Sequence, residues 1–145
     1  MRRIAAALVA FGLALAPRAG ETEAEPLEPE QAFPVHAELL TDKTGRARSV
    51  ELRFDIRDGY YLYANRFKVE APGLALGPLA IPAGTIKKDP FVGDTRILRK
   101  TTHVRVPFAA PAVAGEYWLA VTAQGCAENR ICYAPFTQSA RIVVP

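Results

Sequence analysis

Cys126 and Cys132 are the residues whose type and spacing most readily support chemistry. They are the only cysteines of the chain and lie in Gln124-Gly-Cys-Ala-Glu-Asn-Arg-Ile-Cys-Tyr-Ala-Pro135. A segment with β-like patterning precedes them at residues 116–123, and another follows at residues 137–144. Two such segments joined by a short polar loop predict a β-hairpin. Cysteines on its two sides could face each other closely enough to form a disulfide.

The spacing alone leaves two roles open for this pair. As a structural bridge it would close a loop of about seven residues, and the loop-entropy model gives such a bridge roughly 2.4 kcal/mol. As a reagent it would need a thiolate, an approach path for a partner sulfur, and cover against other thiols. The loop around Phe91 could supply the cover, and Asp89, Tyr61 and Tyr63 could supply polar contacts, but the spacing does not place them there.

Metal binding and hydrolysis are less well supported. Two cysteines and two histidines are the minimum for a zinc site, yet Cys-x5-Cys lacks the tight spacing of structural zinc sites. His36 and His103 are far apart in the sequence, and both lie in strand-like segments. No serine–histidine or paired-acid arrangement is visible. We therefore expect no metal and no organic cofactor.

The first twenty residues differ from the rest of the chain. Arg2 and Arg3 precede an apolar run of about 13 residues followed by small residues, which is typical of a secretory signal peptide. An uncleaved anchor is the alternative. Three of the 18 Lys and Arg residues lie in residues 1–20, which contain no acid, so 15 basic and 15 acidic side chains remain. The basic pI therefore gives no support to nucleic-acid binding. Export favours stable disulfides, and we expect the periplasm.

The remaining sequence predicts an all-β domain. Residues 21–34 are acidic and contain proline, so we expect a flexible lead-in before a domain at residues 35–145. The clearest strand is residues 49–56, where Val50, Leu52, Phe54 and Ile56 alternate with polar side chains. Further strand-like segments occupy residues 35–40, 60–63, 67–70 and 102–108, whereas residues 85–99 are expected to contain a loop. Trp118 is expected in the core. Short strands with frequent turns and no capped helical period indicate an antiparallel β-sandwich.

Three segments resemble a known family. Asp58-Gly-Tyr-Tyr-Leu-Tyr63, Asp89-Pro-Phe-Val-Gly93 and the Gly-Cys-Ala-x4-Cys-Tyr-x-Pro motif occur in this order. Together they resemble the N-terminal periplasmic domain of the thiol:disulfide interchange protein DsbD, over residues 32–144. The resemblance implies an immunoglobulin-like antiparallel β-sandwich that acts as a protein-disulfide reductase, an activity connected with cytochrome c biogenesis.

The resemblance also implies residue roles and partners. Cys132 would form the mixed disulfide and Cys126 would resolve it. A cap loop with Asp89, Phe91 and Gly93 would shield the pair, and Tyr61 and Tyr63 would line the site. The donor would be a membrane thiol reductant, either a DsbD/CcdA-like transmembrane protein or a thioredoxin-like domain. The clients would be periplasmic disulfide isomerases or thioredoxin-like proteins.

Two features depart from the family pattern. Pro90 stands where the family often has an acid before the cap phenylalanine, which removes a charge and is expected to stiffen the cap. The sequence also ends at Pro145, without the membrane-spanning and thioredoxin-like parts of DsbD, so we expect a stand-alone relative with a separate donor. Two other functions remain open: a secreted binding or assembly module with a purely structural disulfide, and a copper or zinc carrier.

Overall fold

The computed structural model describes residues 24–145, so the predicted signal peptide lies outside the described part of the chain. The elements in chain order are α1 (Pro29–Ala32), β1 (Val35–Thr41), β2 (Ala47–Asp55), β3 (Tyr60–Tyr63), β4 (Lys68–Glu70), β5 (Thr85–Asp89), β6 (Gly93–Leu98), β7 (Thr101–Pro107), β8 (Gly115–Ala123), β9 (Gly125–Ala127), β10 (Ile131–Cys132) and β11 (Phe136–Val144). Within residues 24–145, no helix has the length and apolar character needed to span a bilayer.

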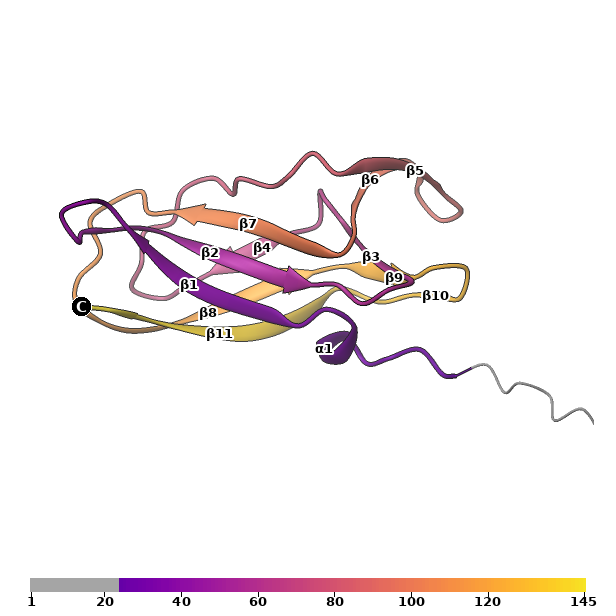
Figure 1. The fold of residues 1–145 in the computed structure, drawn as a ribbon, viewed down its shortest axis with the longest axis horizontal. Helices are drawn as coiled ribbons and strands as arrows, with labels where there is room; N and C mark the ends of the chain where they lie inside the picture. The colour runs from indigo at the N-terminus through magenta and orange to yellow at the C-terminus, as the bar shows by residue number, and fades with distance from the viewer. Residues whose placement is uncertain (1–23) are drawn as a thin grey trace, which may run out of the picture.

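Two antiparallel three-stranded sheets form the sandwich, as the sequence predicts. One has the order β1-β2-β7 and the other the order β11-β8-β4, and they lie over one another in Figure 1. Every second residue of β2 points into the core, where Val50, Leu52 and Phe54 are completely buried. Leu119 and Val121 of β8 meet them in the same core cluster. The fold is the immunoglobulin-like all-β arrangement that was expected.

A third sheet, of order β10-β9-β3-β6-β5, extends one end of the sandwich. The chain leaves β8 at Ala123, passes Gln124 and enters β9 in this different sheet, while β11 pairs with β8. β8 and β11 do pair as predicted, but the cysteines are not in the loop that simply joins them. They occupy a short hairpin of their own, β9/β10, near the β5/β6 hairpin at the same end of the molecule (Figure 1).

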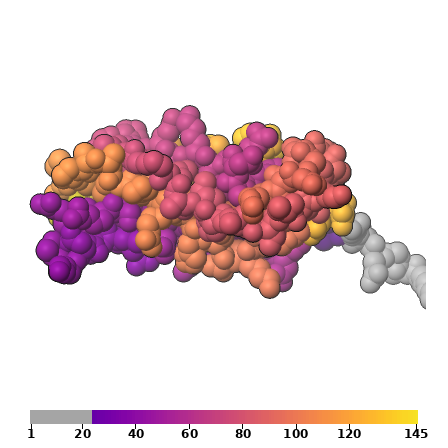
Figure 2. Space-filling view, turned by 90° about the horizontal axis from the view of Figure 1, so that it is seen from above, coloured from indigo at the N-terminus to yellow at the C-terminus, as the bar shows by residue number. Residues whose placement is uncertain are grey.

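The loop expected within residues 85–99 is mostly strand, and this corrects the sequence prediction. β5 and β6 pair from Thr85↔Ile97 to Asp89↔Gly93, so the loop shrinks to three residues at the tip. The alternation was missed because this hairpin has few buried apolar side chains; Ile86 is exposed, and only Ile97 and Leu98 at its base are buried. Seen from above, the salmon atoms of this region gather at one end of the molecule (Figure 2).

Two further expectations are corrected by burial. Trp118 is 56% exposed because it alternates with the inward-facing Leu119 and lies opposite Arg141 on the outer face of the sheet. The ordered domain also begins before residue 35. Ala32 and Phe33 are fully buried, and α1 precedes them in the segment expected to be a flexible lead-in. Ala32 and Phe33 belong to the core cluster although the sequence around them is acidic and contains proline.

Candidate redox site

The cysteine hairpin places the two sulfurs directly opposite one another. Cys126 of β9 pairs with Cys132 of β10, their Cα atoms are 4.0 Å apart, and the side chains form a disulfide. The two cysteines differ in access, because Cys126 is 1% exposed whereas Cys132 is partly exposed. Gly125 permits this arrangement, since a Cβ atom there would lie 2.2 Å from the carbonyl oxygen of Tyr61 on the neighbouring strand.

The tip of the β5/β6 hairpin is organised by Asp89. Its Oδ1 atom accepts hydrogen bonds from the backbone N–H groups of Phe91 at 2.7 Å and Val92 at 3.2 Å. Gly93 then turns the chain back into β6 with φ of 75°, a left-handed conformation that glycine adopts without steric cost. The Asp89-Pro-Phe-Val-Gly93 sequence thus forms a defined tip, here called the cap loop (residues 89–93).

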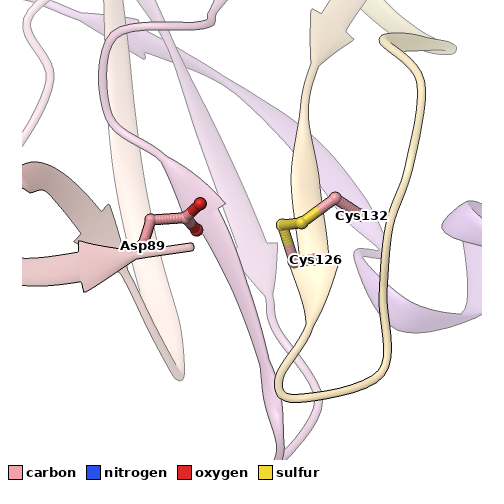
Figure 3. Close-up of side chains that lie close together, drawn as sticks. All are labelled: Asp89, Cys126 and Cys132. Carbon is pink, nitrogen blue, oxygen red and sulfur yellow. A yellow bond between two sulfur atoms is a disulfide. The ribbon is translucent and has the colours of Figure 1, made fainter. Parts of the chain in front are cut away.

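Asp89 also reaches two tyrosines that stand beside the disulfide. Its Oδ2 atom accepts hydrogen bonds from the hydroxyls of Tyr61 at 2.5 Å and Tyr63 at 2.9 Å. The Tyr63 oxygen lies 3.1 Å from Sγ of Cys126 and 3.6 Å from Sγ of Cys132. Figure 3 shows the Asp89 carboxylate directed toward the disulfide. A continuous chain of polar groups therefore leads from the sulfurs to a buried carboxylate.

Burial and hydrogen bonding shift the pKa of Asp89 and the pKa values of the two tyrosines in opposite directions. Burial would raise the pKa of Asp89, but its four hydrogen bonds, led by that from Tyr61, outweigh burial and lower the pKa below its usual value. Burial, reinforced by the hydrogen bond to Asp89, raises the pKa of both Tyr61 and Tyr63. At neutral pH the site therefore holds one carboxylate anion and two neutral phenols.

A groove of about 210 Å³ opens onto the disulfide. Its walls include Cys132 with Ile131 on one side and Pro90 with Phe91 of the cap loop on the other. The Phe91 side chain is 71% exposed, so the cap loop covers the groove only in part. Both cysteines line the groove, but Cys132 is partly exposed and Cys126 almost completely buried, so a visiting group would meet Cys132 first.

Comparison with known proteins places this site in a family. A family model described as "Thiol:disulfide interchange protein DsbD, N-terminal" matches residues 23–143. The chain belongs to the DsbD N-terminal domain family. The family assignment from the three sequence motifs is therefore confirmed.

The relatives and solved structures agree with the family model. The chain is 42% identical over 94 residues to DsbD 1 of Pseudomonas aeruginosa, which covers 63% of this chain and 16% of that protein. It is 37% identical over 119 residues to DsbD of Ralstonia nicotianae, covering 80% of this chain and 18% of that protein. The reduced DsbD N-terminal domain of Neisseria meningitidis matches with a TM-score of 0.68 and 35% identity, covering 81% of this chain and 89% of that one.

A second solved structure is the complex between the DsbD N-terminal and PilB N-terminal domains of Neisseria meningitidis. It matches with a TM-score of 0.64 and 32% identity, covering 80% of this chain and 86% of the matched chain. The present chain thus spans less than a fifth of these two DsbD relatives, but 89% of the separately solved N-terminal domain from Neisseria meningitidis.

Sequence reasoning missed a cluster of charges in this DsbD-type site. Glu128, between the two cysteines, accepts hydrogen bonds from Arg99 at 2.8 Å and Lys87 at 3.1 Å through the same oxygen. These hydrogen bonds lower the pKa of Glu128. The two cations also lie over the ring of Tyr61, at 5.3 Å for Arg99 and 5.6 Å for Lys87. No motif marks this cluster, because its members come from three separate segments.

The N-terminal segment supports the cysteine hairpin from behind, which the sequence also did not reveal. The Phe33 ring packs edge-on against Tyr133 at 5.7 Å and stacks on Phe136 at 5.3 Å. The hydroxyl of Tyr133 donates to the carbonyl oxygen of Leu27 at 2.5 Å. The apolar residues within 24–33 show neither a helical nor a strand period, so the sequence did not predict these contacts.

The side chains that could bind a metal are already engaged in the oxidised DsbD-type site. Potential ligand atoms of Asp89, Cys126 and Cys132 lie within 4.8 Å of one another. The sulfurs are bonded to each other, however, and the carboxylate accepts four hydrogen bonds. His36 and His103 are elsewhere, on the outer face of β1 and β7, where they contact Asp55 and Glu51.

Proposed function

We propose that the domain is a periplasmic thiol–disulfide relay, which takes electrons from a membrane-linked thiol reductant and passes them to disulfides of periplasmic oxidoreductases. The observation that carries this proposal is the unequal exposure of the two bonded sulfurs. Both cysteines line the groove, but Cys132 is partly exposed there, whereas Cys126 is 1% exposed and backed by Tyr63 and Asp89. A purely structural bridge needs no groove leading to one of its sulfurs.

The relay cycle follows from this geometry. In the reduced domain the Cys132 thiolate attacks a client disulfide through the groove, which forms a mixed disulfide and releases one client thiolate. Cys126 then attacks Sγ of Cys132, breaks the mixed disulfide and restores the internal bond. The client gains two electrons and two protons in all. The donor dithiol reverses these steps and becomes oxidised in turn.

The polar chain beside the sulfurs gives the cycle a place for protons. Tyr63 lies within 3.1 Å of Cys126 and 2.9 Å of Asp89, so a cysteine S–H formed on reduction has a hydrogen-bond acceptor close by. The negative charge of Asp89, close to both sulfurs, disfavours a second anion there. We therefore propose that Asp89, Tyr61 and Tyr63 keep the resting dithiol protonated, with Phe91 and Gly93 forming the cap loop over it.

The partners proposed for this relay are other proteins that carry a reactive cysteine pair. The Neisseria meningitidis DsbD N-terminal domain forms a complex with the PilB N-terminal domain, which supports a protein partner for this domain as well. We propose thioredoxin-like proteins or disulfide isomerases as clients and a DsbD/CcdA-like membrane protein or thioredoxin-like domain as donor. The proposed location, the periplasm, rests on residues 1–20 and on the family.

The reduction potential separates this function from a structural bridge. Equilibration of the purified domain in glutathione or dithiothreitol buffers, followed by alkylation and mass spectrometry, gives the oxidised fraction at each potential. An exchange partner should have a potential above about −300 mV and stay folded when reduced, as circular dichroism would show. A potential well below that value, together with unfolding on reduction, would instead support a secreted binding or assembly module with a purely structural disulfide.

A further inference from the structure

We propose that the Lys87–Glu128 ion pair is a positioning device that holds the β5/β6 hairpin against the cysteine hairpin and so limits access to Cys132. This inference deepens the relay proposal and rests on it for its purpose.

The β5/β6 hairpin is fastened to the sheet mainly at its base. β6 pairs with β3 only at Ile97 and Leu98, while β5 is an edge strand that pairs with β6 alone. Nearer the tip, backbone pairing is confined to the hairpin itself, as in Lys87↔Thr95 and Asp89↔Gly93. The position of the tip over the groove must therefore come from side-chain contacts.

One of those contacts joins the two hairpins directly. Among residues 24–145, the bond from Lys87 Nζ to Glu128 Oε1 at 3.1 Å is the single hydrogen bond or ion pair between residues 85–98 and residues 125–133. Lys87 also lines the groove together with Cys126 and Cys132. The pair thus connects the strand that carries the cap loop, beside the groove, to the turn between the cysteines.

The surroundings of the pair make it more than a chance surface contact. The Lys87 and Glu128 side chains are 22% and 30% exposed, so both are partly withdrawn from water. The Lys87 ammonium lies over the ring of Tyr61, whose hydroxyl binds Asp89 of the cap loop. Arg99 fixes the same Glu128 oxygen from the anchored end of β6, so Glu128 is already positioned when Lys87 approaches.

The pair remains weak enough to break during each cycle. Ion pairs of this exposure contribute little, and losing one should raise the population of the open hairpin only about two- to fivefold. The contribution should also decline with ionic strength, because the Debye length falls from about 10 Å at 0.1 M to about 3 Å at 1 M salt. A partner carboxylate that takes Lys87 from Glu128 would open the groove in the same way.

The test uses an uncharged reductant, so that removing a charge changes access and not the attraction of the reagent. Tris(hydroxypropyl)phosphine attacks the disulfide and becomes the phosphine oxide with oxygen from water, while the cysteines gain two electrons and two protons. We expect Glu128→Gln and Lys87→Gln to be reduced about two- to fivefold faster than the wild type. The double variant should be no faster than the faster single variant, because both changes remove one contact.

Three controls make the result specific. Glu51→Gln removes a carboxylate that also binds two basic side chains, His103 and Arg105, but on the outer face of the sandwich, and should leave the rate unchanged. Arg99→Gln removes a partner of Glu128 without cutting the link between the hairpins, and should accelerate reduction less than Lys87→Gln. Raising NaCl from 0.1 to 1 M should accelerate the wild type but not Glu128→Gln.

The outcomes separate this proposal from the relay itself. Equal rates in wild type, Glu128→Gln and Lys87→Gln, with each variant folded by circular dichroism, would overturn the positioning role, as would an equal salt response in wild type and Glu128→Gln. Neither result would bear on the reduction potential, which tests the relay. Conversely, a reduction potential typical of structural disulfides would contradict the relay without changing these relative rates.

Discussion

Replacing Phe91 by alanine should speed attack on the disulfide while the protein remains folded. Phe91 is 71% exposed, so less than a third of its surface is covered while the cap loop is closed. A fully buried aromatic side chain hides about 200 Å², which leaves roughly 60 Å² covered here. At about 25 cal/mol per Å² that contact is worth about 1.5 kcal/mol, or about a tenfold change in cap opening. Part of this contact is with the cap loop itself and does not hold the loop closed. We therefore expect reduction of the disulfide to become about threefold to tenfold faster.

The assay is the rate of disulfide reduction by the neutral phosphine, followed by maleimide labelling and mass spectrometry. Val113→Ala is the matched control, because Val113 is 73% exposed and lies in the connector before β8, away from the groove. Val113→Ala should unfold at the wild-type urea concentration, and Phe91→Ala at a slightly lower one, because unfolding also loses the Phe91 contact. If Phe91→Ala is reduced at the wild-type rate while remaining folded, Phe91 does not limit access and the shielding role is wrong.

Three further predictions concern the groups behind the cap. Tyr63→Phe removes a hydrogen bond to the buried Asp89 carboxylate, and should lower the free energy of unfolding of the oxidised protein by about 1.5–3 kcal/mol in urea titrations; an unchanged midpoint would contradict that bond. Because the fold lowers the pKa of Asp89, its carboxylate stabilises the protein above the unfolded value of about 3.9, and this contribution is lost as pH falls through the folded pKa. Asp89→Asn should therefore lose less stability than wild type between pH 6 and pH 3, and equal losses would speak against the assignment. Gly125→Ala forces a Cβ atom to within 2.2 Å of the Tyr61 carbonyl and should cost about 2–3 kcal/mol, whereas a wild-type midpoint would mean that β9 shifts freely.

The sequence predicted the parts of this fold that repeat a simple pattern. The alternation in residues 49–56 identifies β2 and its buried face, because each inward residue meets the opposite sheet. The same logic fails for Trp118, where residue type suggested the core but the alternation with Leu119 turns the ring outward. β5 and β6 were missed because an edge hairpin that projects from its sheet has little apolar burial to produce a pattern.

The site was partly predictable because its motif residues lie close to the cysteines in space. Tyr61, Tyr63 and Asp89, found through the family motifs, do meet the disulfide through one hydrogen-bonded chain. Lys87 lies outside the three motifs and Glu128 is a variable position of the cysteine motif, so nothing local marks their contact, which joins residues 41 positions apart. Phe33 was assigned to a lead-in by the composition around it, although its ring packs behind the cysteine hairpin. Such contacts depend on tertiary placement, which no local pattern encodes.

Capture of a mixed disulfide at Cys132 tests the central claim most directly. Cys126→Ala leaves Cys132 free to attack a partner but removes the sulfur that resolves the product. In periplasmic extracts quenched with N-ethylmaleimide, this variant should form adducts on non-reducing gels that dithiothreitol dissolves, and Cys132→Ala should form far fewer because Cys126 is buried. If the folded Cys126→Ala variant forms no adduct with any periplasmic protein, or if Cys132→Ala forms them equally well, the proposed relay through Cys132 is contradicted.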